Sequence, residues 1–149
     1  MELVKHDELM AEWETDCAMD QTDVLGELYR CPILHSKYIK ILQNYRLKQR
    51  EYVVKYSELK VALTKYYSGE MNTDELRLRG WDQYRFNKPL KTQMEEKISA
   101  HPEVVKIENR VQYLETLIKS CESIIKEINN RTYLLRSVID WQKFQQGVN

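Results

Sequence analysis

The stretch from Pro32 to Gly69 most constrains what this chain can form. Proline is tolerated in the first turn of a helix, glycine favours the conformation that ends one, and neither occurs between these two residues. Large apolar or aromatic side chains recur between them at steps of three and four, interrupted at Gln49. The repeating positions are Tyr38, Leu42, Tyr45, Tyr52, Tyr56, Leu59, Leu63 and Tyr66. This pattern predicts one long helix, over about residues 33–68, that packs along a companion helix.

The companion is predicted over residues 102–146, which begin at a proline and contain no further Gly or Pro. A heptad stripe runs along it, and a second apolar stripe continues to Trp141 and Phe144. Because one stripe suffices to pack on the first helix, the other would leave an abnormally large apolar face on a monomer. We therefore expect self-association through this helix. The residues assigned to it are Val111, Leu114, Leu117, Ile118, Ile124, Ile125, Ile128, Leu134, Leu135, Val138 and Trp141.

Shorter helices are expected to flank this pair. Residues 3–19 form an amphipathic pattern whose acidic load predicts a segment that is mobile or docked on a partner. A short helix through Val24 and Tyr29 should end or bend before Pro32. A helical turn after Thr73 and a helix over residues 92–99 complete the set, with an irregular loop or a hairpin tip at 81–89.

The predicted fold class is therefore all-α: two long antiparallel helices with short flanking helices, in one domain over residues 1–149. We divide it into an acidic N-terminal segment (1–20), a basic helical region (21–69), a basic and aromatic connection (70–101) and a C-terminal helix (102–149) that forms a homo-oligomer.

Charge is unevenly distributed in a chain whose formal net charge is zero. Residues 1–28 carry nine acidic side chains against Lys5, whereas residues 29–91 carry fourteen basic side chains against six acidic ones. Residues 92–149 are balanced. This asymmetry favours a polyanionic partner for the middle of the chain.

Candidate DNA-binding residues follow from charge and from aromatic rings placed among the cations, since unstacked bases need a flat surface and phosphates need charge. The candidates are Arg46, Lys48, Arg50, Lys55, Lys60, Lys65, Tyr66, Tyr67, Arg77, Arg79, Trp81, Arg85 and Lys88. Two plainer interpretations stay open. The lysines can form a solvated helix face, and Trp81 and Phe86 can cap the helical core.

Motifs for catalysis or metal binding are not found in the sequence. It contains no glycine-rich phosphate loop, GxSxG or HExxH motif, and its three cysteines and three histidines lack ligand spacing. Cys121 falls in an apolar register and is predicted to be a small core residue. We expect a protein that is not an enzyme, needs no cofactor or metal, and does not enter a membrane.

The segment LHSKYIKI (Leu34 to Ile41) and the tetrapeptide YYSG (Tyr66 to Gly69), placed at the end of a lysine-rich helix, resemble the UvsY recombination mediators of T4-like bacteriophages. The resemblance covers about residues 20–146. It implies a hexameric or heptameric ring that binds single-stranded DNA. It also implies that the ring helps displace the phage single-strand binding protein and loads a UvsX-type recombinase, in DNA recombination, repair and replication. The location would be the cytoplasm of the infected bacterial host. In that family the basic residues lie just before YYSG, where this chain has Val61 and Leu63, so Lys55, Lys60 and Lys65 are kept as candidates.

Two other hypotheses remain at this point. One is a coiled-coil scaffold or adaptor without DNA binding. The other is an adaptor whose acidic N-terminus is the active surface.

Overall fold

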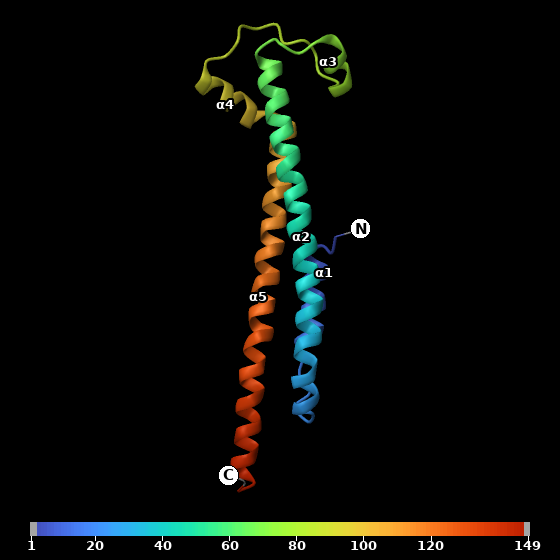
Figure 1. Cartoon of the computed structure of the whole chain (residues 1–149), viewed down its shortest axis with the longest axis vertical. Coiled ribbons are helices and arrows are strands. Elements are labelled where there is room, and N and C mark those ends of the chain that lie inside the picture. Colours follow the sequence, from blue (N-terminus) through green and yellow to red (C-terminus); the bar gives the residue numbers. More distant parts are fainter. Residues whose placement is uncertain (1–2, 148–149) are drawn as a thin grey trace. The chain divides into compact units, whose positions relative to one another are not determined.

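The computed structural model describes residues 3–147, and these residues fold into helices and connecting loops only. The helices are α1 (His6–Asp16), α2 (Val24–Tyr67), α3 (Thr73–Arg79), α4 (Lys91–Ala100) and α5 (Pro102–Gln145). Figure 1 labels them along the chain. The predicted all-α class is confirmed, and so is the prediction that two helices are much longer than the others.

Beyond residue 65, the predicted starts and ends of the helices agree with the structure, because each boundary has a local chemical cause. Gly69 and Gly80 follow α2 and α3 with φ of 72° and 68°, the left-handed conformation that glycine adopts without strain. At the start of α3, the Asn72 side chain accepts from the backbone N–H of Glu75, and the Glu75 carboxylate accepts from the backbone N–H of Asn72. Pro102 occupies the first position of α5.

The chain divides into two compact units, which we describe separately. The first comprises Met1–Lys48 and Leu114–Asn149, and the second comprises Gln49–Tyr113. The long helices α2 and α5 contribute residues to both, and the two helices run antiparallel within each unit.

The first unit is built from α1, the first part of α2 and the second part of α5. Its most deeply buried side chains are Leu9, Tyr38, Tyr45, Leu117, Cys121 and Ile128. Cys121 is fully buried, which confirms the prediction of a small core residue, and burial raises the pKa of its thiol to about 11. Arg131 is also buried, and its guanidinium lies 5.3 Å from the Trp13 ring centroid and donates to the carbonyl of Cys17.

The second unit is built from the end of α2, the start of α5 and the helices α3 and α4. Leu59 and Leu63 of α2 form its core with Met94 and Ile98 of α4 and Val104 of α5. Partly buried side chains pack around these five, namely Tyr56, Tyr66, Tyr67, Trp81 and Ile107. Because α4 covers the end of the helix pair, the apolar seam of α2 has partners as far as its last turn.

The predicted break before Pro32 is wrong. Helix α2 begins at Val24 and continues through Pro32, which is exposed. An interior proline removes one backbone hydrogen bond and costs about 3 kcal/mol. Burial of the neighbouring Cys31, Leu34 and Tyr38 offsets this cost, since each buried apolar side chain contributes about 1.5–3 kcal/mol.

The N-terminal segment does not match the prediction of a mobile or partner-docked element. Leu9 is fully buried inside the first unit, and the Trp13 ring meets Tyr38 edge-on at a centroid distance of 5.5 Å. Asp16 accepts hydrogen bonds from Lys37 at 2.7 Å and from the Tyr38 hydroxyl at 2.9 Å. Part of its acidic load is therefore paired with Lys37 of α2, which lies more than twenty positions away in the sequence.

The expected second apolar stripe of α5 is only partly available. Leu117 and Ile124 are buried within the first unit, with exposed fractions of 1% and 4%, so they do not belong to a free face. Toward the end of the helix, Leu134, Trp141 and Phe144 are exposed. Leu117 and Ile124 find packing partners within this chain, because α1 joins α2 and α5 in the first unit to make a three-helix arrangement. Within residues 3–147, no helix is apolar over the length that crossing a bilayer requires.

Candidate nucleic-acid interface

Lys60 lies in a groove of the second unit that also presents Lys65. The groove has a volume of about 600 Å³. Its lining residues are Ser57, Lys60, Val61, Thr64, Lys65, Ser68 and Glu70. Lys60 is exposed, and within residues 3–147 its ammonium group has no ion-pair partner. The hydroxyls of Ser57 and Thr64 donate to backbone carbonyls of α2, so the lysines and Ser68 are the side-chain donors available to an incoming anion.

Lys65, in the same groove, is already paired. Its ammonium group contacts the Glu75 carboxylate of α3 at 2.5 Å. This hydrogen bond, together with the one from the Asn72 backbone, lowers the pKa of the Glu75 carboxyl. Glu75 therefore stays ionised at neutral pH and partly neutralises Lys65, so a phosphate would have to compete with it.

A second groove, of about 400 Å³, has mixed charge. It is lined by Lys55, Glu58, Leu59, Arg79, Glu103, Lys106 and Ile107. Lys55 contacts Glu51 one turn away at 2.8 Å, and this hydrogen bond raises the pKa of its ammonium group. Lys106 is not among the residues predicted from the sequence, because its position on α5 gives no sign that it lies in a groove with Lys55 and Arg79.

The second unit as a whole is only weakly basic, with twelve Lys and Arg against ten Asp and Glu. Any attraction for a polyanion must therefore come from the local arrangement of cations. Several candidates are exposed, and no ion pair joins them to any other residue of the described chain. They are Arg50, Arg77, Arg85 and Lys88.

Two candidates belong to the first unit instead. Arg46 contacts Glu122 of α5 at 2.6 Å, and Lys48 is half-buried. The structure thus divides the row of basic residues that the sequence places along one helix. Arg50, Lys55, Lys60 and Lys65 lie in the second unit with the connection, whereas Arg46 and Lys48 do not.

The predicted stacking residues Tyr66, Tyr67 and Trp81 pack against the core of the second unit. The Tyr66 ring lies 5.2 Å from those of both Tyr67 and Trp81, and its hydroxyl donates to the carbonyl of Asp82 at 2.6 Å. Burial raises the pKa of both tyrosine hydroxyls. The guanidinium of Arg79 lies 5.1 Å from the Trp81 ring centroid. Trp81 thus packs on the core, as the interpretation of a core cap expects, whereas Phe86, the other ring of that interpretation, is exposed.

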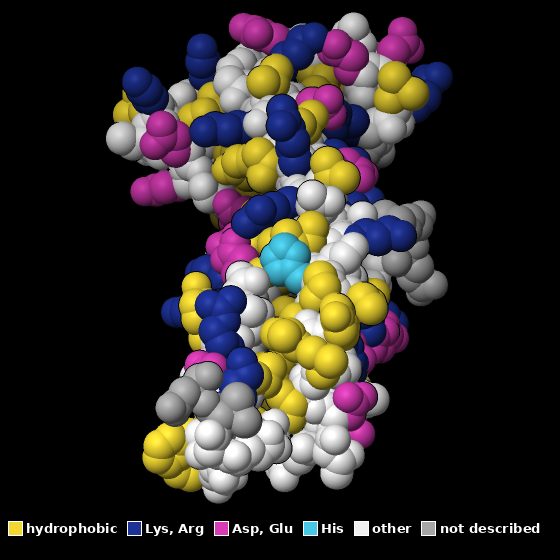
Figure 2. Space-filling model, turned by 60° about the horizontal axis from the view of Figure 1, so that its bottom comes forward, with side chains coloured by type: hydrophobic (Ala, Val, Ile, Leu, Met, Phe, Trp, Pro, Cys, Tyr) yellow, Lys and Arg dark blue, Asp and Glu magenta, His cyan; other side chains and the backbone are white. Residues whose placement is uncertain are grey.

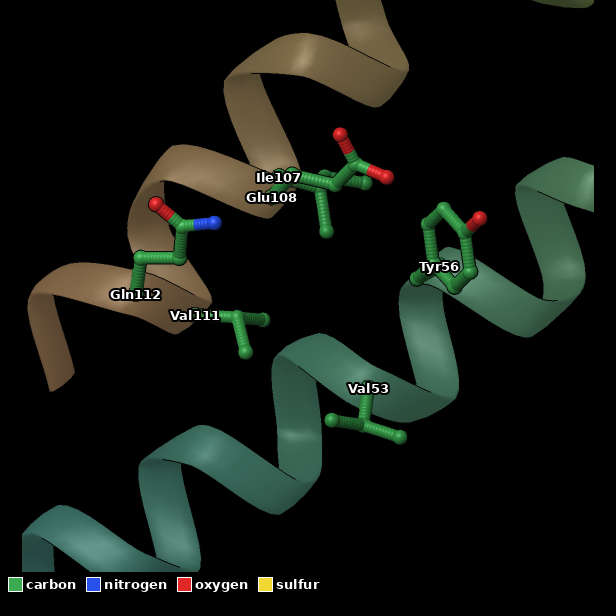
Figure 3. A pocket seen from close by; sticks show the side chains of 6 residues that line it. All are labelled: Val53, Tyr56, Ile107, Glu108, Val111 and Gln112. Carbon is green, nitrogen blue, oxygen red and sulfur yellow. The ribbon is translucent and has the colours of Figure 1, made fainter. Parts of the chain in front are cut away.

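A further groove, of about 310 Å³, lies between α2 and α5 of the second unit. Figure 3 shows Val53 and Tyr56 on one helix and Ile107 and Val111 on the other, all bordering the same space. Its polar side chains are Glu108 and Gln112, so no cation lines it. This groove does not suit an anionic ligand.

The assigned oligomerisation residues differ in their exposure. Six of them are buried within the first unit: Leu114, Leu117, Ile118, Ile124, Ile128 and Leu135. Val111, Ile125 and Val138 are half-buried, and Leu134 and Trp141 are exposed. Figure 2 shows hydrophobic side chains gathered at the surface near the start of α2 and the end of α5.

Together, these features define the class of protein by its all-α fold and by the cations at two of its grooves. The described residues form an all-α fold built on two long antiparallel helices, with grooves lined by lysine and arginine side chains. Within residues 3–147 no group of three or more His, Cys, Asp or Glu side chains could hold a metal ion.

Comparison with known proteins gives the family within this class. The family model described as "Recombination, repair and ssDNA binding protein UvsY" matches residues 12–148. The chain belongs to the UvsY family, whose members are recombination mediators and not enzymes.

Individual relatives agree with this assignment. The recombination protein uvsY of Enterobacteria phage T4 is 26% identical over 144 residues, which are 95% of this chain and 97% of that protein. A crystal structure of the phage T4 recombination mediator protein UvsY, in lattice type II, superimposes with a TM-score of 0.80 at 22% identity. It covers 95% of this chain and 98% of the other. The type IV lattice gives a TM-score of 0.78, over 93% and 97% of the two chains.

Proposed function

We propose that this protein loads a UvsX-type recombinase onto single-stranded DNA in exchange for the phage single-strand binding protein, in recombination, repair and replication. The observation that carries the proposal is the match of residues 12–148 to a family of single-stranded DNA-binding recombination proteins. The same match argues against a scaffold without DNA binding.

The DNA backbone meets the second unit, along the cations of α2 and of the connection. Lys60 is the first contact in this proposal because its ammonium group is exposed and no carboxylate of the described chain neutralises it. Arg50, Arg77, Arg85 and Lys88 are further exposed cations of this unit that could contact the backbone of the strand. Lysine and arginine side chains bind phosphates without reading bases, so binding is tolerant of sequence and strongly dependent on salt.

The protein acts as a ring-shaped homo-oligomer of six or seven subunits. Trp141 and Phe144 support this proposal, since their rings stack at a centroid distance of 5.7 Å while remaining 58% and 73% exposed. Apolar rings in such a position gain by burial against another copy. A ring repeats one weak DNA site several times, so that a strand spanning several subunits binds with avidity.

The first test is fluorescence anisotropy of labelled oligo-dT over a salt series, with the mass of the protein checked by light scattering. Lys60→Ala should weaken binding and reduce the slope of log K against log salt by about 0.7 for each phosphate that the variant no longer neutralises. Adding Lys65→Ala should weaken binding further, by less than the first change, because Glu75 already occupies Lys65.

Lys37→Ala is the matched control. It removes the same charge from the same helix, but Lys37 is held by Glu12 and Asp16 at 3.1 and 2.7 Å in the first unit. Its salt slope should equal that of the wild type. Equal slopes for wild type, Lys60→Ala and the double variant would remove both lysines from the DNA path.

Recombinase loading is tested separately, on single-stranded DNA coated with the phage single-strand binding protein. The wild type should shorten the delay before a UvsX-type recombinase assembles, and Lys60→Ala should shorten it less. If the wild type binds oligo-dT but leaves the delay unchanged, the loading proposal fails.

A further inference from the structure

We propose that Phe86, at the loop between α3 and α4, is the side chain that stacks on a base of the bound strand. The inference rests on the proposed function, and it replaces Trp81, Tyr66 and Tyr67 as the stacking residues. It starts from the exposure of the rings in the second unit. Phe86 is 78% exposed, whereas the other three pack against the core.

The Phe86 ring stands on a chain of aromatic contacts. Its centroid lies 5.5 Å from that of Tyr84, and Tyr84 lies 5.2 Å from Tyr67 and 5.6 Å from Tyr66. The inner rings of the chain are only partly exposed, and the outermost ring, Phe86, is the one most open to solvent. A base placed on Phe86 would extend this chain of rings outward.

The loop that carries Phe86 is attached on both sides. Before it, the Tyr66 hydroxyl donates to the carbonyl of Asp82 at 2.6 Å, and after it, Pro89 is buried. An exposed ring on a tethered loop loses less conformational freedom on binding than one on a free segment. The position of the ring is thus prepared before any ligand arrives.

Cations lie near the ring in sequence and against its aromatic neighbours. Arg85 and Lys88 are exposed close to Phe86 in sequence, and the Lys97 ammonium lies 5.5 Å from the Tyr84 centroid and 5.7 Å from that of Tyr67. A flat apolar ring among cations matches a nucleotide, which presents a base face beside a phosphate. Because phenylalanine offers no hydrogen bond, the contact accepts any base.

The test compares three variants on two ligands: a short oligo-dT and an abasic sugar–phosphate strand of equal length. Phe86→Ala removes the ring, and Phe86→Tyr keeps it. Leu78→Ala is the control, since Leu78 is an apolar side chain of α3 that is 88% exposed. Both positions are open to solvent, and circular dichroism confirms that each variant keeps its helices.

Phe86→Ala should bind oligo-dT about five- to tenfold more weakly than the wild type, the lower part of the range for one base stacked on an aromatic ring. Its affinity for the abasic strand and its salt slope should not change, and Phe86→Tyr and Leu78→Ala should bind both strands as the wild type does.

Equal binding of oligo-dT by Phe86→Ala and wild type would overturn the inference and leave the proposed function standing. An equal loss of affinity for both strands would also overturn it, because a base contact cannot weaken binding to a strand without bases. A wild type that binds neither strand would refute the proposed function itself.

Discussion

Lysines that are equivalent in the sequence differ in what their ammonium groups contact. Lys37 bridges Glu12 and Asp16, Lys65 contacts Glu75, and Lys60 has no carboxylate partner in the described chain. A paired lysine contributes less free energy to phosphate binding, because its own carboxylate must be displaced. Charge counts along α2 therefore overstate the number of available cations.

Asp16 is the clearest case of a single side chain that joins distant segments. It accepts from Lys37 and Tyr38, and Arg30 lies 3.8 Å away. Burial alone would raise the pKa of this carboxyl, but the hydrogen bonds and the two positive charges outweigh that effect. Its pKa therefore lies below the ordinary value of 3.8.

This pKa shift predicts a stability difference that depends on pH. A carboxyl whose pKa is lowered by folding stabilises the folded state above its unfolded pKa of about 3.8, and this contribution is lost as the pH falls through the lower folded value. At pH 7, Asp16→Asn should reduce the free energy of unfolding by about 1–2 kcal/mol, because charge-assisted hydrogen bonds are removed. The difference should shrink as the pH falls below 3.8 and through the lower folded pKa of Asp16.

Urea unfolding at several pH values measures the difference in the free energy of unfolding between Asp16→Asn and the wild type. Glu14→Gln is the control, an exposed acidic residue of the same helix whose carboxylate contacts no cation within residues 3–147. If Asp16→Asn and Glu14→Gln unfold alike at pH 7, the Asp16 contacts contribute nothing to stability.

At the scale of elements, α2 illustrates how packing overrides a local signal. Proline favours an extended residue before it and removes a backbone donor, yet Cys31 and Pro32 both lie inside the helix. The carbonyl of Leu28 thereby lacks its usual helical partner. The buried side chains on either side keep the helix continuous.

Pro32→Ala should therefore stabilise the protein. Alanine restores the backbone N–H and removes a penalty of about 3 kcal/mol, while the more flexible unfolded chain takes back up to about 1 kcal/mol. A net gain of about 2–3 kcal/mol would raise the melting temperature by roughly 4–12 °C in a protein of this size. Differential scanning calorimetry measures the shift.

Ser36→Ala, one turn further along α2 and also exposed, is the matched control and should change the melting temperature little. A Pro32→Ala variant that melts at or below the wild-type temperature would mean that the proline is preferred in this helix.

At the scale of the whole molecule, the uneven charge along the sequence would place the acidic N-terminal segment and the basic middle of the chain on separate surfaces with different functions. Instead, the acidic α1 neutralises basic residues of α2 inside the first unit, through Asp16 with Lys37 and Arg30. The exposed cations proposed to bind DNA lie in the second unit. The exposed apolar end of α5 lies in the first.

The proposed ring predicts the effect of charges placed at that apolar end. A double variant, Trp141→Glu with Phe144→Glu, should shift the protein from an oligomer to a monomer, because burying two carboxylates at an apolar contact is strongly unfavourable. Both side chains are exposed in the single chain, so its helical content should not change. Light scattering measures the mass.

Leu78→Glu, on α3 of the second unit, controls for the added charge and should leave the mass unchanged. The monomeric variant should bind a long strand less tightly than the ring does, since it has no avidity. A double variant with the wild-type mass would exclude this end of α5 from the interface.

The sequence by itself determined the features that depend on residues close to one another along the chain. The heptad steps define the buried side of α2, where Tyr38, Leu42, Tyr45, Leu59 and Leu63 are all buried. Glycine and proline mark the end of α2 and the start of α5 because their backbone preferences act within one turn. The family resemblance likewise depends on local segments such as YYSG, and the family match confirms it.

Only the tertiary structure decided which of these side chains remain free. Helix α1 is docked, Leu117 and Ile124 are buried, Tyr66 and Tyr67 face the core, and Lys60 is unpaired in the described chain where Lys65 is not. Each of these outcomes depends on residues far apart in the chain, such as Cys17 with Arg131 or Lys65 with Glu75. Helical period and cap chemistry carry no information about such partners, because burial and ion pairing are properties of packed surfaces.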